Sequence, residues 1–415
     1  MPKEHHRGHS TRSEHVIVPE VETLLTIQTL PNAVCKLHHE TVRDNHLQLD
    51  ADDAGIVRLH ARASKDSKPM ELRLECRGQD GKTTDYTIVV CADAREGARL
   101  KKSEAEGAPK KHGTLRRALA GDPLKLSNKE LMAAGYPPRP DPAHSPARFG
   151  RWLKKVSRPF TSVADRRVSH PGVAFAHRQL PPVILSPTLP LPPPSAKSMF
   201  NSNNNTWSGA YATSPAAQFF WIEADWTVPQ VLALQNGPDY SAVAEWVGLD
   251  NGGPDLFQSG TDSECWYFPF FGWTFTNYWM WIESLPSAPY ALPNFPVSPG
   301  DHVSVDIFVA DQNGSTWFQN GTSGGLTPAD NSVWFMLYNY SNGSSYWGTL
   351  STSTGFSGGT VEFIIERPQD FNSGIAFPLA FFPLALMWSC WYGDSQYGDR
   401  PWKLGANGST RPMGT

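Results

Sequence analysis

The second half of this 415-residue chain is a succession of short apolar runs, each about as long as a β-strand. Turns rich in Gly, Asn, Pro and Ser separate the runs, and no long stretch repeats its apolar residues at helical spacing. The pattern predicts an all-β fold, an antiparallel two-sheet jelly roll or β-sandwich over residues 199–393. Its runs are FFWIEADWTV, SAVAEWVGL, NYWMWIESL, HVSVDIFVA, VWFMLYNY, TVEFIIER and the stretch Phe377–Trp391.

The last run, Phe377–Trp391, is strongly apolar and raises the question of a membrane segment. It is too short to span a bilayer, and Pro378 and Pro383 interrupt it. We therefore expect a buried strand there, followed by a polar tail over residues 394–415.

The first half of the chain has a different organisation. Apolar residues occupy every second position in HLQLDAD, GIVRLHARA, MELRLECR and DYTIVVCA, which is the period of half-buried strands. This alternation predicts a small β-sandwich-like module over residues 21–92, preceded by a flexible tail over residues 1–20. Residues 93–180 are basic and partly helical, and residues 181–198 form a Pro-rich linker.

Two short helices are expected within the basic stretch. Ser127 is followed three residues later by Glu130, the pattern of a capping box at a helix N-terminus. The second helix is predicted by apolar residues at helical spacing with Arg and Lys between them: Phe149, Trp152, Leu153 and Val156.

Charge is distributed unequally between the two halves. Residues 1–200 hold 32 Lys and Arg against 22 Asp and Glu, whereas the rest of the chain holds 4 against 18. A domain so acidic repels itself at neutral pH, and protonation of its carboxylates relieves the repulsion. The imbalance is typical of a protein that works in acid, although an ordinary acidic domain has the same composition.

The cysteines and histidines limit the chemistry. The five cysteines form no CxxC pair and have no metal-ligand spacing, so we expect neither a metal nor a cofactor. A bridge between Cys265 and Cys390 is compatible with the sequence, which does not establish it. His302 is the only histidine after residue 177, so a Ser/His/Asp triad would depend on it alone. Any chemistry in the acidic half must therefore be carried by carboxylates.

Two polar residues stand out in this half. Gln258 begins a strand after a Gly/Asn-rich turn, and its amide cannot titrate. In TVEFIIER the period of two places Glu362, with Ile364 and Glu366, on one face of the strand. A lone strand glutamate is usually solvated, but in a partly dry cleft its pKa would be raised.

Several blocks recur in an order that resembles the glutamic endopeptidases, the eqolisins of peptidase family G1. They are NNTWSGAY, FFWIEADWTVP, WVGLD, FQSGTD, WMWIE and VEFIIE, and they cover roughly residues 200–383. The resemblance implies a two-sheet jelly roll that works in acid with a catalytic Gln/Glu dyad, here Gln258 and Glu362. It also implies that five further residues line the cleft or support the dyad: Trp246, Asp250, Asp262, Trp281 and Glu283.

Two other functions fit the same pattern. Trp platforms and facing carboxylates also suit a carbohydrate-binding or glycoside-hydrolysing jelly roll. A non-catalytic peptidase homologue would keep the fold without the reaction. Retention of both Gln258 and Glu362 favours the peptidase.

The expected partners follow from this interpretation. They are polypeptide substrates and the chain's own basic segment, residues 93–195, held on the acidic half as an intramolecular inhibitor until acid weakens the pairing. Nucleic-acid binding by the basic segment is a weaker alternative, and we expect no nucleic acid, no membrane and a monomer. Family resemblance suggests secretion, yet the first residues, MPKEHHRGHSTRSEH, lack the apolar core of a signal peptide.

Overall fold

The protein was analysed as a computed structural model, whose described residues are 11–17, 19–38, 48–93, 122–133, 136–158, 161–175, 206–213, 219–233, 239–250, 256–311, 313–314, 316, 331–351, 358–383, 385–394, 398–401 and 409–411. The Pro-rich linker and most of both predicted tails lie outside these residues. None of the described helices is long and apolar enough to cross a membrane.

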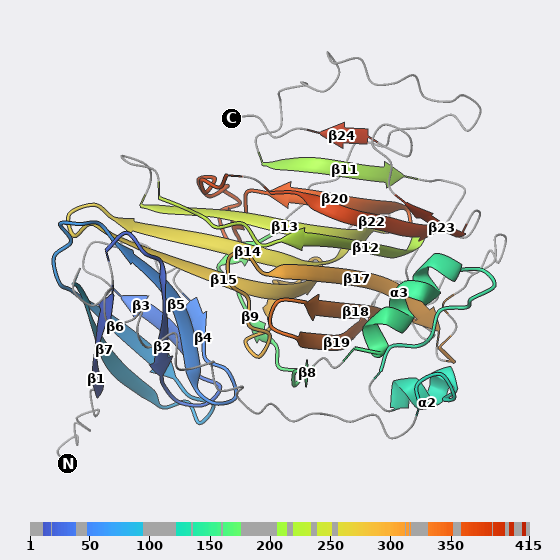
Figure 1. Ribbon diagram of the computed structural model, residues 1–415, viewed down its shortest axis with the longest axis horizontal. Helices are drawn as coiled ribbons and strands as arrows, with labels where there is room; N and C mark the ends of the chain where they lie inside the picture. The colour runs from blue at the N-terminus through green and yellow to red at the C-terminus, as the bar shows by residue number, and fades with distance from the viewer. Residues whose placement is uncertain are drawn as a thin grey trace.

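Two large sheets form the body of the molecule (Figure 1). The ten-stranded sheet has the order β2 (Thr23–Gln28), β5 (Ile56–Ala63), β15 (Trp273–Ser284), β14 (Leu256–Phe268), β13 (Tyr240–Asp250), β20 (Thr360–Glu366), β11 (Trp207–Thr213) and β24 (Ser409–Arg411), with β16 (Tyr290–Ala291) on β15 and β9 (Val168–Ser169) on β16. The seven-stranded sheet has the order β23 (Gly398–Pro401), β22 (Met387–Asp394), β12 (Phe219–Thr227), β17 (His302–Asp311), β18 (Asn331–Asn339), β19 (Ser344–Ser351) and β8 (Thr161–Ser162).

The strand pairs of these two sheets are antiparallel except for the short β8–β19 pair. Val247, Phe257 and Phe363 of the larger sheet belong to one buried cluster with Ile222 and Val305 of the smaller one. This cluster is the interior of the sandwich, as strands with one apolar face require. The predicted all-β, antiparallel, two-sheet architecture is confirmed.

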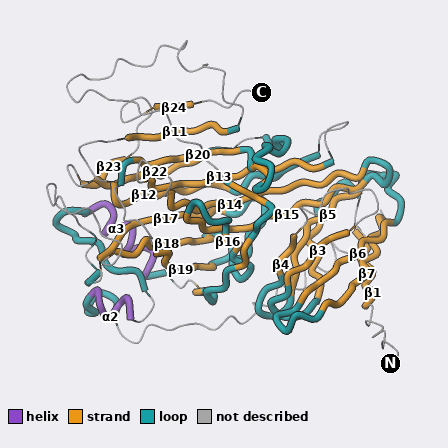
Figure 2. Tube along the Cα trace, turned by 180° about the vertical axis from the view of Figure 1, so that it is seen from behind, coloured by secondary structure: helices purple, strands orange, loops and turns teal. Residues whose placement is uncertain are grey.

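The N-terminal strands form a third sheet, with the order β1 (Thr11–Ile17), β7 (Thr83–Ala92), β6 (Met70–Arg77), β3 (Val34–His38) and β4 (Gln48–Asp50). Strands β2 and β5 instead extend the large sheet, because β5 pairs with the beginning of β15. The core of this region therefore includes residues of the large sheet, Trp266, Phe268, Trp273 and Phe275. Figure 2 shows this continuity from behind.

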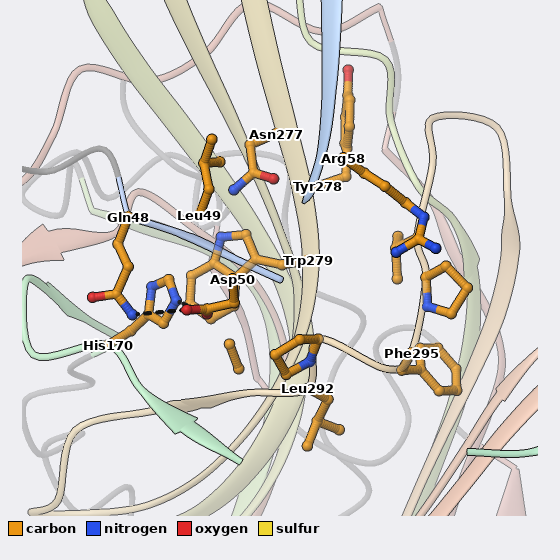
Figure 3. A pocket seen from close by; sticks show the side chains of 14 residues that line it. Gln48, Leu49, Asp50, Arg58, His170, Asn277, Tyr278, Trp279, Leu292 and Phe295 are labelled. Carbon is orange, nitrogen blue, oxygen red and sulfur yellow. Dashed lines mark hydrogen bonds and ion pairs between the residues drawn. The ribbon is translucent and has the colours of Figure 1, made fainter. Parts of the chain in front are cut away.

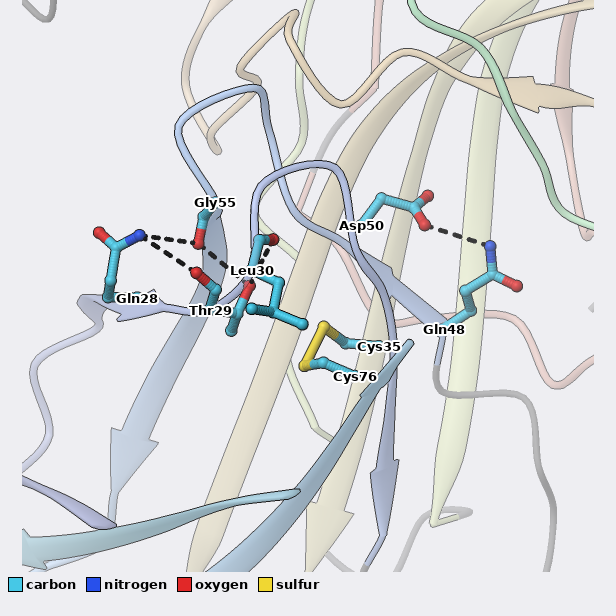
Figure 4. The surroundings of a disulfide bond; sticks show 8 residues. All are labelled: Gln28, Thr29, Leu30, Cys35, Gln48, Asp50, Gly55 and Cys76. Atoms are coloured by element: carbon cyan, nitrogen blue, oxygen red, sulfur yellow. Dashed lines mark hydrogen bonds between the residues drawn. A yellow bond between two sulfur atoms is a disulfide. The ribbon is translucent and has the colours of Figure 1, made fainter. Parts of the chain in front are cut away.

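A disulfide bond joins Cys35 of β3 to Cys76 of β6, which lie directly opposite each other in the register (Figure 4). Cys265 and Cys390 are free. The bridge that the sequence left open between these two is therefore not formed.

Both expected helices are present, α2 (Asn128–Ala133) and α3 (Pro146–Val156). At α2, the Glu130 carboxylate accepts from the backbone N–H of Ser127 at 2.7 Å, and the Ser127 hydroxyl accepts from the N–H of Glu130 at 3.3 Å. This reciprocal pair is the capping box predicted from the sequence.

The expectation for Phe377–Trp391 is wrong in part, because a regular strand begins only at Met387. The described residues between 377 and 386 contain isolated bridges rather than a strand. Phe381 and Leu386 are 47% and 58% exposed, so the stretch is not a buried strand. Proline cannot donate a ladder hydrogen bond, and Pro378 and Pro383 account for the interruption.

Candidate active site

The two predicted catalytic residues lie on strands that flank β13, and both are paired with the same residue of β13. Gln258 of β14 and Glu362 of β20 both lie directly opposite Gly248 of β13. Directly opposed residues point to the same side of a sheet. Both side chains therefore lie on the face that points away from the sandwich interior. We call this the dyad face. Two strand spacings separate Gln258 from Glu362, about 10 Å between Cα atoms, and Gly248 places no side chain between them.

The row continues on both sides. Tyr211 of β11 lies opposite Glu362, and Glu283 of β15 lies opposite Gln258. Gln258, Glu362 and Glu283 are each 0% exposed, so the carboxyl groups of this row are shielded from solvent.

The other predicted residues occupy neighbouring rows of the dyad face. Trp246 and Trp281 lie on either side of Gly260, two residues along the strands from the dyad. Asp262 follows in the next row, opposite Trp279. Asp250 is the last residue of β13 and pairs with Thr360 in the backbone register. The seven predicted positions thus share one region of one sheet.

Side-chain hydrogen bonds orient the central groups. The Nε2 of Gln258 donates to Oε2 of Glu283, and it also donates to the backbone carbonyl of Phe175 at 2.7 Å. The indole N–H of Trp246 donates to Glu366 at 2.8 Å. The amide donor of Gln258 therefore points at a peptide carbonyl in this structure.

That carbonyl belongs to the segment that precedes the linker, and the segment lies on the dyad face. The ring of Phe175 stacks on Trp281 with centroids 3.9 Å apart and planes 8° apart. Phe175 is fully buried in a cluster with Trp246, Trp281 and Ile364. Sequence analysis did not predict a role for Phe175, whose only local sign is a short apolar run, GVAFA, in a basic stretch.

Four carboxyl groups of the dyad face, those of Glu283, Asp262, Glu366 and Glu264, favour the neutral form. Burial raises the pKa of Glu283 well above its usual value, and the nearby Glu366 adds to the effect. Burial likewise raises the pKa of Asp262, with Glu264 as the next cause. The pKa of Glu366 is raised to about 8 and that of Glu264 to about 7, in both cases mainly by burial. These four groups therefore keep their protons at pH values at which an exposed carboxyl is ionised.

Beside the dyad face, a small cavity of about 50 Å³ contains a histidine from the same segment (Figure 3). His170 stacks on Trp279, with centroids 4.3 Å apart, and its Nε2 lies 2.7 Å from Asp50 of β4. The N-terminal region thus contacts the segment through Asp50.

Helix α3 covers the outer face of the other sheet, where buried charges pair. Lys155 is 3% exposed, and its Nζ lies 2.8 Å from Glu223 and 3.7 Å from Asp306. Arg151 makes two hydrogen bonds to Glu223, at 2.6 and 2.7 Å. Beside these groups lies a cavity of about 340 Å³ that also reaches His302.

The two carboxyl groups in this cluster, those of Glu223 and Asp306, have pKa values shifted in opposite directions. Burial opposes ionisation of Glu223, but Lys155 and Arg151 outweigh it and lower its pKa. Burial raises the pKa of Asp306 to about 6, because Lys155 lies farther from it and Glu223 adds like charge. The basic segment and the acidic half therefore meet through specific pairs, with Glu223 as the ionised centre.

A family model described as the Peptidase A4 family matches residues 205–328. The matched segment includes Gln258 and ends before Glu362, so the strand register is what joins the second residue to the first.

Among solved structures, two of scytalido-glutamic peptidase are similar: one with a transition state analog inhibitor (22% identity, TM-score 0.35) and one with a peptide based transition state analog (20% identity, TM-score 0.34). Each alignment covers 48% of this chain, and 84% and 88% of the two structures. A third, SCP-B of the eqolisin family in a complex with the tripeptide Ala-Ile-His, has 22% identity and a TM-score of 0.32, covering 48% of this chain and 83% of that one. No curated protein matches.

The family match confirms the resemblance drawn from the sequence motifs. The class of enzyme expected from those motifs, a glutamic-type peptidase that hydrolyses peptide bonds, is confirmed with it.

Proposed function

We propose that the protein is an acid-active endopeptidase that cleaves polypeptides with Glu362 and Gln258 and is made as a precursor. One observation carries the proposal: the two residues lie opposite the same glycine and point to the same face. An amide and a carboxyl placed in this way can act on two sides of one peptide bond.

The reaction uses one water molecule. The Glu362 carboxylate takes a proton from the water as its oxygen bonds to the carbonyl carbon. The carbonyl oxygen becomes an oxyanion, which accepts a hydrogen bond from the Gln258 amide. The C–N bond then breaks, and Glu362 returns the proton to the leaving amine, giving a carboxylic acid and an amine. Glu283 is a positioning residue, because its carboxyl accepts a hydrogen bond from the same amide nitrogen.

The test is degradation of a denatured protein at pH 2–5 in the presence of a pepstatin-type inhibitor, to which we expect the activity to be insensitive. Glu362→Gln should abolish cleavage, and Gln258→Ala should lower the rate by about a hundredfold through loss of one oxyanion donor. Glu245→Gln is the matched control, because Glu245 is a buried carboxyl of β13 that hydrogen-bonds to Thr261 in the sandwich interior. Full activity in Glu362→Gln would refute the proposal, and glycoside cleavage that survives Gln258→Ala would favour the carbohydrate alternative.

The precursor part of the proposal is supported by two contacts of the N-terminal half. The carbonyl of Phe175 occupies the Gln258 donor, and the charges of α3 pair with Glu223 and Asp306. Incubation of the full chain at pH 3–4 should shorten it from the N-terminus and raise its activity. An uncleaved chain that is fully active at neutral pH would contradict an inhibitory segment.

A further inference from the structure

Residues 168–175 are bound along the dyad face by backbone pairing on two sides. Val168–Ser169 pairs antiparallel with β16, which itself pairs with β15 next to Trp281. Strand β10 (Val173–Ala174) pairs antiparallel with β21 (Gln369–Asp370). Adding an extended strand to existing edges is a general way of binding peptides, in which side-chain pockets supply the specificity.

The side chain best enclosed in this arrangement is that of Phe175. Its ring lies nearly parallel to Trp281 at 3.9 Å, and Trp279 lies 5.9 Å away. The same residue supplies the carbonyl that accepts from Gln258 at 2.7 Å. One residue therefore meets both the proposed oxyanion donor and an aromatic platform.

We infer that Trp281 determines specificity and selects substrates with an aromatic side chain on the residue whose carbonyl is attacked. This inference rests on the proposed function and names its substrate class. Phe175 occupies the position of that residue, on the acyl side of the bond to Ala176. Glu283 and Trp281 are neighbours at alternate positions of β15, so the strand that orients Gln258 also carries the platform.

The neighbouring contact supports the same geometry. His170, another flat ring, stacks on Trp279, which is two residues from Trp281 on the same face of β15. The two indoles thus receive rings that are five positions apart along the bound segment. The ring on Trp281 belongs to Phe175, whose carbonyl accepts from Gln258, so Trp281 selects the side chain of the residue at the cleaved bond.

The experiment compares peptides that differ only on the acyl side of one cleavable bond, with Phe, Tyr, Leu or Ala there. The acid-treated full chain is assayed at pH 2–5, and mass spectrometry locates each cut. We expect kcat/KM for Phe and Tyr to exceed that for Ala by about ten- to a hundredfold, the range for filling or emptying an apolar subsite. In Trp281→Leu the ratio of Phe to Leu should fall toward one while the Leu peptide is still cleaved.

The ratio of two substrates within one preparation does not depend on how much of a variant is folded. Trp388→Leu serves as the matched control, because Trp388 is a partly exposed residue of β22 in the other sheet and the Phe to Leu ratio should persist in the variant. Equal cleavage of all four peptides by the wild type would overturn the inference, as would an unchanged ratio in Trp281→Leu. Failure to cleave any peptide would instead reject the proposed function itself.

Discussion

Glu245 offers a sharp test of how this fold depends on pH. It lies in β13 with its side chain in the sandwich interior, 1% exposed. Its Oε2 accepts a hydrogen bond from the Thr261 hydroxyl at 2.9 Å, and that hydroxyl accepts from the indole N–H of Trp226 at 2.8 Å. Among the described residues its other carboxyl oxygen has no hydrogen-bond partner. Burial raises the pKa of Glu245 to about 8.

The sign and size of the effect follow from proton binding. The folded protein holds the Glu245 proton more tightly than the unfolded chain, whose glutamate pKa is about 4.3. Below that value both states are protonated, and between it and about 8 folding stability falls as pH rises. At about 1.4 kcal/mol per pKa unit, the loss approaches ~5 kcal/mol as an upper bound.

Glu245→Gln removes the titration but keeps the shape and an oxygen that can accept from Thr261. We expect equal unfolding midpoints for variant and wild type at pH 4.5, and a more stable variant at pH 8.5. Thermal unfolding followed by tryptophan fluorescence measures this, because Trp226 is linked to the site through Thr261. The difference between the two proteins isolates Glu245 from the other buried carboxyls. If both lose stability in parallel with rising pH, Glu245 is not responsible.

Two further perturbations test the other contacts. Lys155→Met removes the buried cation that Glu223 and Asp306 share, and breaking a buried pair in this way costs about 3–5 kcal/mol of stability. N-terminal shortening should therefore begin at higher pH in the variant, which gel analysis across a pH series would measure. The neighbouring exposed Lys154→Met is its control, and equal pH midpoints for the two variants would contradict a role for the buried pair. Gly248→Ala places a methyl group between the dyad residues, 2.9 Å from a Leu256 side-chain carbon and 3.1 Å from the ring of Trp246. We expect kcat of the folded variant to fall about ten- to a hundredfold, and undiminished kcat would refute the geometry of the row.

Local pattern predicted the strands and, within each strand, the face of each residue. In TVEFIIER the period of two predicted that Glu362 lies on one face of the strand and that Val361 and Phe363 lie on the other. Val361 and Phe363 belong to the interior cluster, as expected. The pattern could not predict the register between strands, because β13 pairs not only with the next strand, β14, but also with β20, which follows more than a hundred residues later. That Gly248 lies between Gln258 and Glu362 is a property of three strands together.

Long-range contacts explain the remaining differences. Charge composition predicted that a basic segment could dock on the acidic half, but not that Lys155 would be buried against Glu223. The cysteines gave no indication of their partners, since Cys35 and Cys76 meet only through the pairing of β3 with β6. Phe175 was missed because a single phenylalanine carries no periodicity.

Two attachments of the basic segment, one on each large sheet, differ in how they respond to acid. Helix α3 is held by ionised Glu223, whose lowered pKa means that its contribution is lost only as the pH falls below the ordinary glutamate range. Phe175 is held by an amide-to-carbonyl hydrogen bond and a stacked ring, and neither of these titrates. Acid therefore weakens the attachment on the seven-stranded sheet while leaving the one on the dyad face. If the segment is an inhibitor, lowering the pH loosens it but does not by itself clear Gln258, so full activation requires the chain to be cut.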